Sequence, residues 1–496
     1  MPDTASGAAL RARGDDEIET VDVEAVNARG RRKLYEKRRK IYPKKADGRF
    51  RRLKWLVMAV TLAIYYIAPW IRWDRGPAMP DQAILIDLPA RRFYFFFIEI
   101  WPDEVYFITG LLIVAALALF LFTSLFGRVW CGYACPQTVW TDLFIAVERW
   151  IEGERNQRIR LDAAPWSIGK LTRKSAKHAI WLAIAIATGG AWVFYYADAP
   201  TLAGQLVRFE APTVAYGFIA LFAFTTYTLG GIAREQVCTY MCPWPRIQAA
   251  LQDEESLVVS YHPVRGEPRG PHKKGESWIG HGACVDCKQC VAVCPMGIDI
   301  RDGQQLECIS CALCIDACDS VMDKIGQPRG LIAYATLAGL AHEPTAAKPE
   351  LRLVRPRTLV YGIAIAVASG VMAFALATRD LVEIAVDHDR NPLFVMLSDG
   401  SIRNAYTFKI ANKNHTERSY RLSVEHLRDA AIAVSEGGSD ADPVVTVPPD
   451  QLRTFRVLVT VPGGTLRDHE RHLRFVATDV ADGSTAEHES VFRGPK

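Results

Sequence analysis

One cysteine spacing occurs twice in this chain, and it fixes what that segment can fold around. The first run is Cys284-x2-Cys287-x2-Cys290-x3-Cys294, and the second is Cys308-x2-Cys311-x2-Cys314-x3-Cys318. In bacterial ferredoxins with two cofactors, such a run gives three thiolates to one 4Fe-4S cluster and its fourth thiolate to the other. The short gaps let three sulfurs wrap one face of a cube, while the longer gap carries the fourth sulfur toward the neighbouring cube.

We therefore predict two crosswise sets of ligands. The first cluster is held by Cys284, Cys287, Cys290 and Cys318, and the second by Cys308, Cys311, Cys314 and Cys294. Zinc knuckles would need only isolated groups of four ligands, and neither they nor a disulfide framework would need a thiol every third residue in two runs. The spacing thus indicates two 4Fe-4S clusters in a protein that transfers electrons.

Five stretches of the chain are apolar and free of Asp, Glu, Lys and Arg: 55–71, 105–126, 179–197, 213–233 and 359–377. Each has about the length that a helix needs to cross a hydrocarbon core of roughly 30 Å. The first contains Pro69 and is short, but it lies too far from the N-terminus to be a cleaved signal peptide. The segment 84–101 mixes aromatic and charged residues and is predicted to lie in the membrane interface.

Lysine and arginine are distributed unequally around these stretches. Residues 1–54 carry sixteen, residues 128–177 nine and residues 234–357 fourteen, whereas the loops 72–104 and 198–212 together carry five. By the positive-inside rule, the N-terminus and the cysteine runs lie in the cytoplasm, and the segment after the fifth helix lies in the periplasm. That segment contains no cysteine, while the cluster thiolates stay on the reducing side.

The N-terminal residues 1–53 contain two dense basic runs, 31–33 and 37–40. We predict a solvated cytoplasmic tail, with contact to anionic lipid as a secondary role. The net charge of the whole chain is only +4, and the sequence has no basic helix with interleaved aromatic residues. Nucleic acid is therefore not expected as a partner.

The other four cysteines form a second matched pair of motifs, Cys131-Gly-Tyr-Ala-Cys135-Pro136 and Cys238-Thr-Tyr-Met-Cys242-Pro243. Each motif follows two apolar stretches, so the membrane half is predicted to consist of two hairpin repeats, each ending in Cys-x3-Cys-Pro at the cytoplasmic rim. Cysteines four residues apart lie on one face of a helix and can hold a metal together. The proline that follows would end or redirect the segment.

These rim cysteines, Cys131, Cys135, Cys238 and Cys242, are the predicted catalytic and metal-binding residues of the membrane half. Soft thiolates suit Cu(I), zinc or an iron–sulfur group, and Met241 is a thioether neighbour. The alternatives are a dithiol–disulfide relay, which needs a dedicated partner in a reducing compartment, and four cysteines that are simply buried. The matched repetition favours metal binding or electron transfer, at one site of four thiolates or at two sites of two.

Residues 379–496 show short alternating runs separated by Asp-Gly, Pro-Pro-Asp and Pro-Gly-Gly turns. The runs 405–410, 419–425, 452–461 and 472–478 are predicted to be strands. About 110 residues of this pattern indicate a sandwich of about seven strands, of immunoglobulin type but without its disulfide.

The predicted fold is multi-domain. It combines an α-helical membrane domain of five transmembrane helices, an inserted α+β ferredoxin module with two 4Fe-4S clusters, and a C-terminal all-β immunoglobulin-like sandwich. The boundaries are a basic tail at 1–53, four transmembrane helices at 54–233, a cytoplasmic segment at 234–357 with the ferredoxin module at about 275–325, a fifth helix at 358–378 and a periplasmic domain at 379–496.

The motifs at 127–140 (GRVWCGYACPQTVW) and 235–246 (EQVCTYMCPWPR) resemble those of a known family. With the double ferredoxin run and the five-helix order, they are similar to the cytochrome c oxidase accessory proteins called CcoG, FixG or RdxA. The resemblance covers nearly the whole chain after the first few dozen residues, and the membrane half also resembles quinol-linked membrane polyferredoxins. One departure is Asp319, which stands where a proline often follows the second run and should lower the potential of the nearby cluster.

The resemblance implies a multi-pass protein of the bacterial inner membrane that supports assembly of cbb-type cytochrome c oxidase as an oxidoreductase, reducing Cu(II) to Cu(I). The eight ferredoxin cysteines would hold the clusters, and the rim cysteines would form the redox or copper site. Expected partners are membrane lipid, oxidase subunits or copper-delivery proteins, and a cytosolic or quinol electron donor. Two alternatives stay open: a quinol-linked electron conduit to a periplasmic acceptor, and a non-enzymatic scaffold for oxidase assembly.

Overall fold

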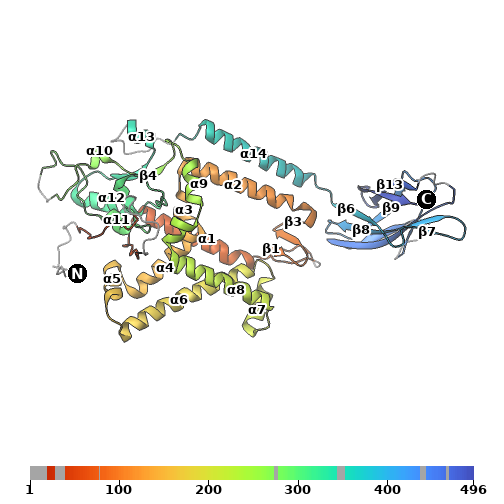
Figure 1. The fold of residues 1–496 in the computed structure, drawn as a ribbon, viewed down its shortest axis with the longest axis horizontal. Helices are drawn as coiled ribbons and strands as arrows, with labels where there is room; N and C mark the ends of the chain where they lie inside the picture. The colour runs from red at the N-terminus through yellow and green to blue at the C-terminus, as the bar shows by residue number, and fades with distance from the viewer. Residues whose placement is uncertain are drawn as a thin grey trace. The chain divides into compact units, whose positions relative to one another are not determined.

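The computed structural model describes residues 19–27, 39–76, 79–272, 277–342, 352–435, 443–464 and 469–495. They form two compact units (Figure 1). The first unit runs to Ile71 and from Gln82 to Val371, and it holds the long helices and the cysteine-rich segment. The second unit holds residues 72–81 and the chain from Met372 onward, and most of it is a β-sandwich.

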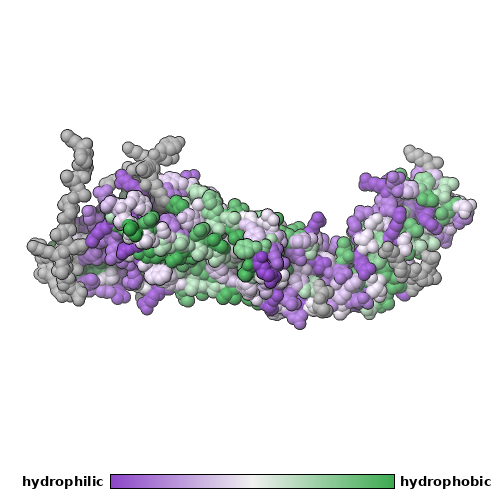
Figure 2. All heavy atoms as spheres, turned by 90° about the horizontal axis from the view of Figure 1, so that it is seen from below, coloured by the Kyte–Doolittle hydropathy of each residue, from purple (hydrophilic) through white to green (hydrophobic). Residues whose placement is uncertain are grey.

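Within the described residues, five helices are long and apolar enough to cross a membrane, which agrees with the predicted number of spans in this multi-pass membrane protein. Hydrophobic surface gathers over the helical part of the first unit, and hydrophilic surface gathers over its cysteine-rich part (Figure 2). The five are α1 (Arg49–Ile67, with a short turn to Trp70), α2 (Tyr106–Phe126), α6 (Ile168–Val193), α8 (Thr213–Thr226, continued by the π-helical turn η3, Tyr227–Ala233) and α14 (Pro356–Ala377).

The third span begins at Ile168, well before the predicted start at residue 179, because three lysines belong to its first turns. Lys174 and Lys177 pair with carboxylates of α4 (Pro136–Glu152) and α5 (Arg155–Ala163). Lys170 donates to the backbone carbonyls of Asp162 and Ala164 at 2.9 and 2.6 Å. Lys177 Nζ lies 2.9 Å from Glu152, and Lys174 Nζ lies 2.5 Å from Asp162. The sequence prediction counted only residues without Asp, Glu, Lys or Arg, so it excluded the first turns of this helix. Lysines whose charges are paired with carboxylates can nevertheless belong to a membrane helix.

The segment predicted to be interfacial, 84–101, is a three-stranded antiparallel sheet of β1 (Ile84–Asp87), β2 (Arg92–Phe95) and β3 (Ile98–Ile100). Tyr94 is buried, whereas Phe97 is 72% exposed. Exposed aromatic side chains next to a span agree with a position in the interface. The short helix α7 (Ala199–Arg208) lies in the loop that joins the third and fourth spans.

The cysteine-rich part is closed by a two-stranded antiparallel sheet of β4 (Val258–Tyr261) and β5 (Ile332–Ala335). These strands bring the two ends of the part together, and the cysteines lie between them in the chain, so the module is of the predicted α+β type. Its helices are α10 (Pro263–Gly266), α11 (Gln289–Val293), the short turn η5 (Ile300–Asp302), α12 (Leu313–Ile325) and α13 (Leu337–His342).

The prediction of a solvated N-terminal tail is wrong for the part that the structure describes. Asn27 is buried and donates from its side chain to the Met296 carbonyl at 2.6 Å, and Ile41 packs against Gly297. Lys44 N–H donates to the Ala292 carbonyl at 2.8 Å. The basic run 31–33 and residues 37–38 lie outside the described residues, and so the lipid contact predicted for them stays a prediction.

The second unit is an all-antiparallel sandwich of immunoglobulin type, as predicted, and its described residues contain nine strands rather than about seven. All four predicted strands lie within strands of the structure. One sheet has the order β10-β12-β8-β6 with β7 beside β8, and the other has the order β11-β9-β13-β14. The strands are β6 (Val382–His388), β7 (Val395–Met396), β8 (Ile402–Asn412), β9 (Arg418–Glu425), β10 (Ala431–Val434), β11 (Val444–Val447), β12 (Gln451–Val461), β13 (Glu470–Asp479) and β14 (Thr485–Arg493).

The core of the sandwich explains why alternating residues revealed its strands. Side chains at every second position of β8, including Tyr406, Phe408 and Ile410, are fully buried. They meet Phe475 of β13 and Phe492 of β14 from the other sheet in one hydrophobic cluster. Two sheets that each bury one face produce this two-residue period.

Candidate iron–sulfur and rim-cysteine site

The two ferredoxin runs fold alike in their first halves, although α11 (Gln289–Val293) ends before Cys294 and α12 (Leu313–Ile325) continues past Cys318. Asp286 and Lys288 in the first run have positive φ, and so do the matching residues Ser310 and Ala312 in the second. Helices α11 and α12 then begin at matching positions, directly after Lys288 and Ala312. Left-handed backbone at four non-glycine residues costs free energy and persists only where the surrounding structure imposes it. Here it curls each loop so that its cysteines turn inward.

The first iron–sulfur site is a pocket whose cysteines come from both runs. They are Cys284, Cys287, Cys290 and Cys318. Apolar side chains such as Val321 and Leu331 complete the wall. Burial raises the pKa of the Cys318 thiol well above its usual range, and the neighbouring cysteines of the first run raise it further.

The second iron–sulfur site is a pocket lined by the complementary set of cysteines. They are Cys294, Cys308, Cys311 and Cys314, and Cys290 lines this pocket as well. Burial raises the pKa of the Cys294 thiol to about 12, and Cys311 adds to the shift. Cys318 thus lies with the first run and Cys294 with the second, the arrangement that the crosswise assignment requires, and the two ligand sets stay a prediction.

Both sites fit a 4Fe-4S cluster in donor number and chemistry. Each is lined by at least four cysteine sulfurs in a largely apolar wall, and a buried thiol whose pKa is raised becomes a thiolate only when metal displaces its proton. Within the described part of the chain, no three His, Cys, Asp or Glu side chains converge closely enough to hold one metal ion. Sulfurs spread over a cube, each bonded to a different iron, do not need to converge in that way.

The rim motifs also fold alike, and in each the proline redirects the chain as predicted. Cys131 lies in the single-turn helix α3 (Val129–Tyr133), and Cys135 is the residue before α4, which begins at Pro136. In the second copy, Cys238 lies in the π-helical turn η4 (Val237–Met241), and Cys242 ends it. The following helix is α9 (Trp244–Leu251). Short π-helical segments often mark functional positions, and here one carries a rim cysteine.

All four rim cysteines lie near one another. Burial raises the pKa of the Cys238 thiol to about 12, and the charges of Cys135, Cys131 and Cys242 add to the shift. Cys131 is buried and donates to Gln248 Oε1 at 3.1 Å, whereas Cys242 is exposed to solvent. The rim therefore has an inner end at Cys131 and an accessible end at Cys242.

The inner end of the rim packs directly on the second iron–sulfur site. Gly132 follows Cys131, and a Cβ atom there would lie 2.6 Å from the Ile309 carbonyl oxygen and 2.9 Å from Cys311 Cα. Only glycine permits this approach of two backbones. One hydrophobic cluster contains Cys131 and Cys311, with Cys238, Cys294, Cys308 and Cys314 packed against it.

Three protein-family models match the rim segment, the cysteine-rich part and the sandwich of this chain. Residues 108–153, which include Cys131 and Cys135, match a 4Fe-4S binding domain family. Residues 233–337 match a 4Fe-4S dicluster domain family, and residues 372–495 match the family described as the IG-like fold at the C-terminal of FixG.

Whole-chain relatives decide the assignment. Nitrogen fixation protein FixG of Rhizobium meliloti is 54% identical to this chain, covering 96% of it and 97% of the relative. From Cereibacter sphaeroides, Protein RdxB is 55% identical over 93% of this chain and 97% of its own length, and Protein RdxA is 52% identical over 87% and 91%. The chain belongs to the FixG/RdxA/RdxB family.

This FixG-family protein is thus an iron–sulfur membrane protein with 4Fe-4S binding domains and a FixG-type C-terminal sandwich. The resemblance noted from its motifs is confirmed. The comparisons give the family and the cofactor class, and the geometry above adds which cysteines lie together.

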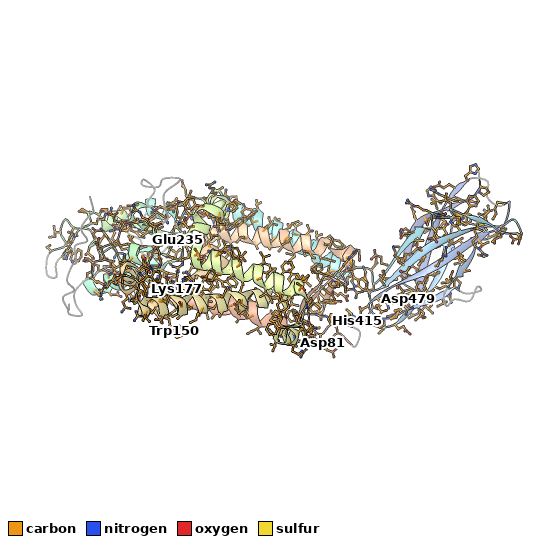
Figure 3. All side chains as sticks on the ribbon, turned by 60° about the horizontal axis from the view of Figure 1, so that its bottom comes forward. Asp81, Trp150, Lys177, Glu235, His415 and Asp479 are labelled. Carbon is orange, nitrogen blue, oxygen red and sulfur yellow. The ribbon has the colours of Figure 1, made fainter. Side chains whose placement is uncertain are left out.

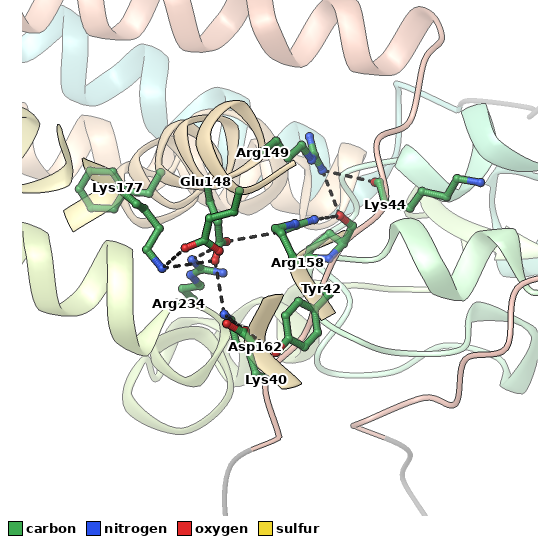
Figure 4. Close-up of polar contacts among 12 residues, drawn as sticks. Lys40, Tyr42, Lys44, Glu148, Arg149, Arg158, Asp162, Lys177 and Arg234 are labelled. Atoms are coloured by element: carbon green, nitrogen blue, oxygen red, sulfur yellow. Dashed lines mark hydrogen bonds and ion pairs between the residues drawn. The ribbon is translucent and has the colours of Figure 1, made fainter. Parts of the chain in front are cut away.

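A buried ion network next to the rim is a feature that the sequence analysis missed (Figure 4). Glu148 of α4 is fully buried, and its carboxylate lies 2.8 Å from Arg234, 3.3 Å from Arg158 and 3.8 Å from Lys177. Lys177 and Glu235 lie at the same end of the helical part (Figure 3). Rows of carboxylates on α4 and of lysines at the start of α6 could have suggested this pairing. The sequence alone does not say that the two helices meet.

The same network holds the N-terminal segment in place. Lys40 Nζ lies 2.7 Å from Asp162 and 3.5 Å from Glu148. Arg158 donates to the Pro43 carbonyl at 2.6 Å. Since Lys44 also contacts the cysteine-rich part, residues 40–44 link it to α4 and α5.

Glu148→Gln should destabilise the first unit, because it leaves several buried cations without their carboxylate. Breaking a buried ion pair from one side typically costs about 3 to 5 kcal/mol. We expect a lower thermal unfolding temperature of the detergent-solubilised protein. Glu210→Gln, in an ion pair with Arg208 whose side chains are both more than half exposed, is the control and should change it little. Equal effects of the two substitutions would contradict a structural role for the network.

The same carboxylate predicts how stability depends on pH. Burial alone would raise the pKa of Glu148, but Arg234 first, and then Lys40, Arg158 and Lys177, lower it from 4.5 to about 2. Because the folded-state pKa lies below the unfolded value, this contribution to stability is present above about pH 4.5 and is lost as the pH falls toward 2. Unfolding temperatures measured over this range should converge for the native protein and Glu148→Gln at the acid end.

The crosswise grouping of the ferredoxin cysteines predicts pairs of equivalent variants. Cys294→Ser should lose the same cluster as Cys308→Ser, and Cys318→Ser the same cluster as Cys287→Ser. Iron content and EPR spectra of the reduced proteins check this, because each variant should keep about half of the iron. If Cys294→Ser instead gives the same EPR spectrum as Cys287→Ser, each run holds its own cluster and the crosswise grouping is wrong.

Proposed function

We propose that this FixG-family protein is an oxidoreductase of the bacterial inner membrane that reduces Cu(II) to Cu(I) in support of cbb-type cytochrome c oxidase assembly. The observation that carries the proposal is the packing of the Cys131–Gly132 backbone on the Cys311 loop, which leaves no residue between the rim and the second iron–sulfur site. Electron transfer slows steeply with distance, so such a contact favours transfer between these two places.

When bound, the 4Fe-4S clusters supply one-electron redox chemistry. The chain's own residues then have separate tasks. The eight ferredoxin cysteines hold the cofactors in an apolar environment, and Gly132 sets the close approach of the rim. The copper substrate takes up one electron per ion, and a cytosolic or quinol donor supplies that electron from the other end.

The exposed end of the rim is suited to receive the copper substrate. Cys242 is exposed, and the neighbouring Met241 is 63% exposed. Thiolate and thioether sulfur are the ligands that stabilise Cu(I), so copper that gains an electron here would be held in its reduced form until a partner takes it. The 4Fe-4S family match over Cys131 and Cys135 supports a redox role of the rim over simple burial.

The proposed orientation has the N-terminus and the clusters in the cytoplasm and the sandwich in the periplasm. Three observations support it: the bias of lysine and arginine in the loops, the odd number of candidate spans, and the lack of cysteine after the fifth span. In this orientation the sandwich could dock to oxidase subunits or to copper-delivery proteins outside the cytoplasm. Membrane lipid surrounds the five spans.

The proposal predicts copper reduction that depends on the rim. Protein purified anaerobically with both clusters and then reduced should convert Cu(II) to Cu(I), which a specific chelator traps. The cluster absorbance should return to that of the oxidised clusters, and the number of electrons lost by the clusters should equal the number of Cu(I) ions formed. A variant with all four rim cysteines changed to Ser should keep its iron and its EPR signals but form Cu(I) only at the rate of protein-free controls.

Cys242→Ser alone tests the accessible end of the rim, and we expect it to lower the rate while the clusters stay intact. If the four-Ser variant reduces copper as fast as the native protein, copper reduction through the rim is wrong. Oxidation of the reduced clusters by a quinone, with no response to copper, would favour the quinol-linked conduit instead. A scaffold without redox activity predicts that neither oxidant acts and that oxidase assembly survives the four-Ser substitution.

A further inference from the structure

Among the described residues, three arginines with nearly fully buried side chains lie beside the redox sites, and two of them are neutralised by carboxylates. A fourth, Arg265, is only partly buried and lies near Cys318 and Asp319. Arg301 lines the first iron–sulfur site and pairs with Asp299 at 2.6 Å and Asp286 at 2.5 Å. Arg234, four residues before Cys238, pairs with Glu148 at 2.8 Å. Each of these side chains is 5% exposed, so its charge is balanced inside the protein.

Arg128 is the counterpart of Arg234 in the first rim motif, and its surroundings differ. It is 5% exposed, and no carboxylate of the described residues lies within ion-pair distance of it. Its guanidinium instead donates to Gln248 Oε1 at 3.4 Å and to the Leu306 carbonyl. Gln248, which is fully buried, also accepts from the Cys131 thiol. Arg128 therefore spans the rim and the loop that leads into Cys308.

A buried cation with only neutral partners is costly unless a negative charge is supplied nearby. Thiols of the rim and of the second iron–sulfur site lie near Arg128 and can supply one. Asp253 and Glu254 line the same pocket as Arg128, but Asp253 pairs with Arg355 at 2.7 Å instead. In agreement, burial raises the pKa of the Cys131 thiol to about 11 while Arg128 opposes that rise, and the same holds for Cys308. The positive charge of Arg128 thus acts on both places at once.

Carboxylates lie beside both sites, and those of the first site include the two that pair with Arg301. Asp286 and Asp299 stand beside the first site, and Asp319 directly follows its ligand Cys318. Near the second site, Glu307 precedes Cys308 but has an interaction of its own. Asp316, two residues after Cys314, accepts the backbone N–H groups of Phe50 at 3.2 Å and Arg51 at 2.7 Å, which stabilise its negative charge at the start of α1 without cancelling it.

We propose that Arg128 is a positioning residue that makes the second iron–sulfur site easier to reduce than the first and so draws electrons toward the rim. An added electron makes a site more negative, and a buried uncompensated cation stabilises that state, whereas carboxylates destabilise it. The electron given up by the first site is the one gained by the second. The inference rests on the proposed electron-transfer role but not on copper as the acceptor.

The test is an EPR-monitored redox titration of the intact protein in detergent, without copper. Arg128→Gln should shift the higher of the two midpoint potentials downward and leave the lower one in place. Arg128→Lys keeps the charge and should restore most of the shift. Arg329→Gln is the matched control, since Arg329 lies on the same module, is 67% exposed and pairs with the exposed Asp323, and it should move neither potential. Cys294→Ser identifies the higher transition as that of the second site by removing it.

Several results would overturn the inference: no shift in Arg128→Gln, a shift of the lower transition, an equal shift of both, or a Cys294→Ser variant that retains the higher transition. If Arg128→Gln fails to assemble its clusters, Arg128→Lys is compared with the native protein. Because Lys keeps the positive charge, both midpoint potentials should stay near their native values, and a clear fall of the higher one would show that charge is not the cause. Copper reduction can fail while the shift is observed, so the two proposals fail separately.

Discussion

The approach of the Gly132 backbone to the Cys311 loop is the contact on which the rest of this structure depends. A side chain at position 132 would meet the Ile309 carbonyl oxygen at 2.6 Å, so the rim motif and the second iron–sulfur site are joined only because a glycine separates Tyr133 from Cys131. The contact places a membrane motif against a ferredoxin loop more than a hundred residues away in the sequence. Arg128 on one side and the Glu148 network on the other hold the two parts in this arrangement.

Much of the fold could be predicted from local patterns. The cysteine spacing predicts that Cys318 lies with the first run and Cys294 with the second, because a ferredoxin run encodes its geometry within a few residues. The alternating strands of the sandwich and the number of spans followed from burial periods of two residues and from helix length. Pro136 redirected the chain after Cys135, as its ring requires.

The remaining features depend on pairings between distant segments. Lys174 and Lys177 extend the third span because carboxylates on α4 and α5 neutralise them. The segment around Asn27 and Ile41 is polar and basic enough to suggest a solvated tail, yet it packs on the cysteine-rich part through backbone bonds and a glycine contact. The different partners of Arg128 and Arg234, which occupy matching positions in a repeat, are likewise invisible until the three-dimensional neighbours are known.

Serial transfer from the first site through the second to the rim is the central claim, and one measurement addresses it directly. Cys294→Ser protein that retains its first cluster would be reduced anaerobically and mixed with Cu(II), and the absorbance of that cluster would be followed over time. Serial transfer predicts that the first cluster stays reduced, because its route to the rim runs through the second site. Reoxidation at the rate seen in the native protein would contradict it.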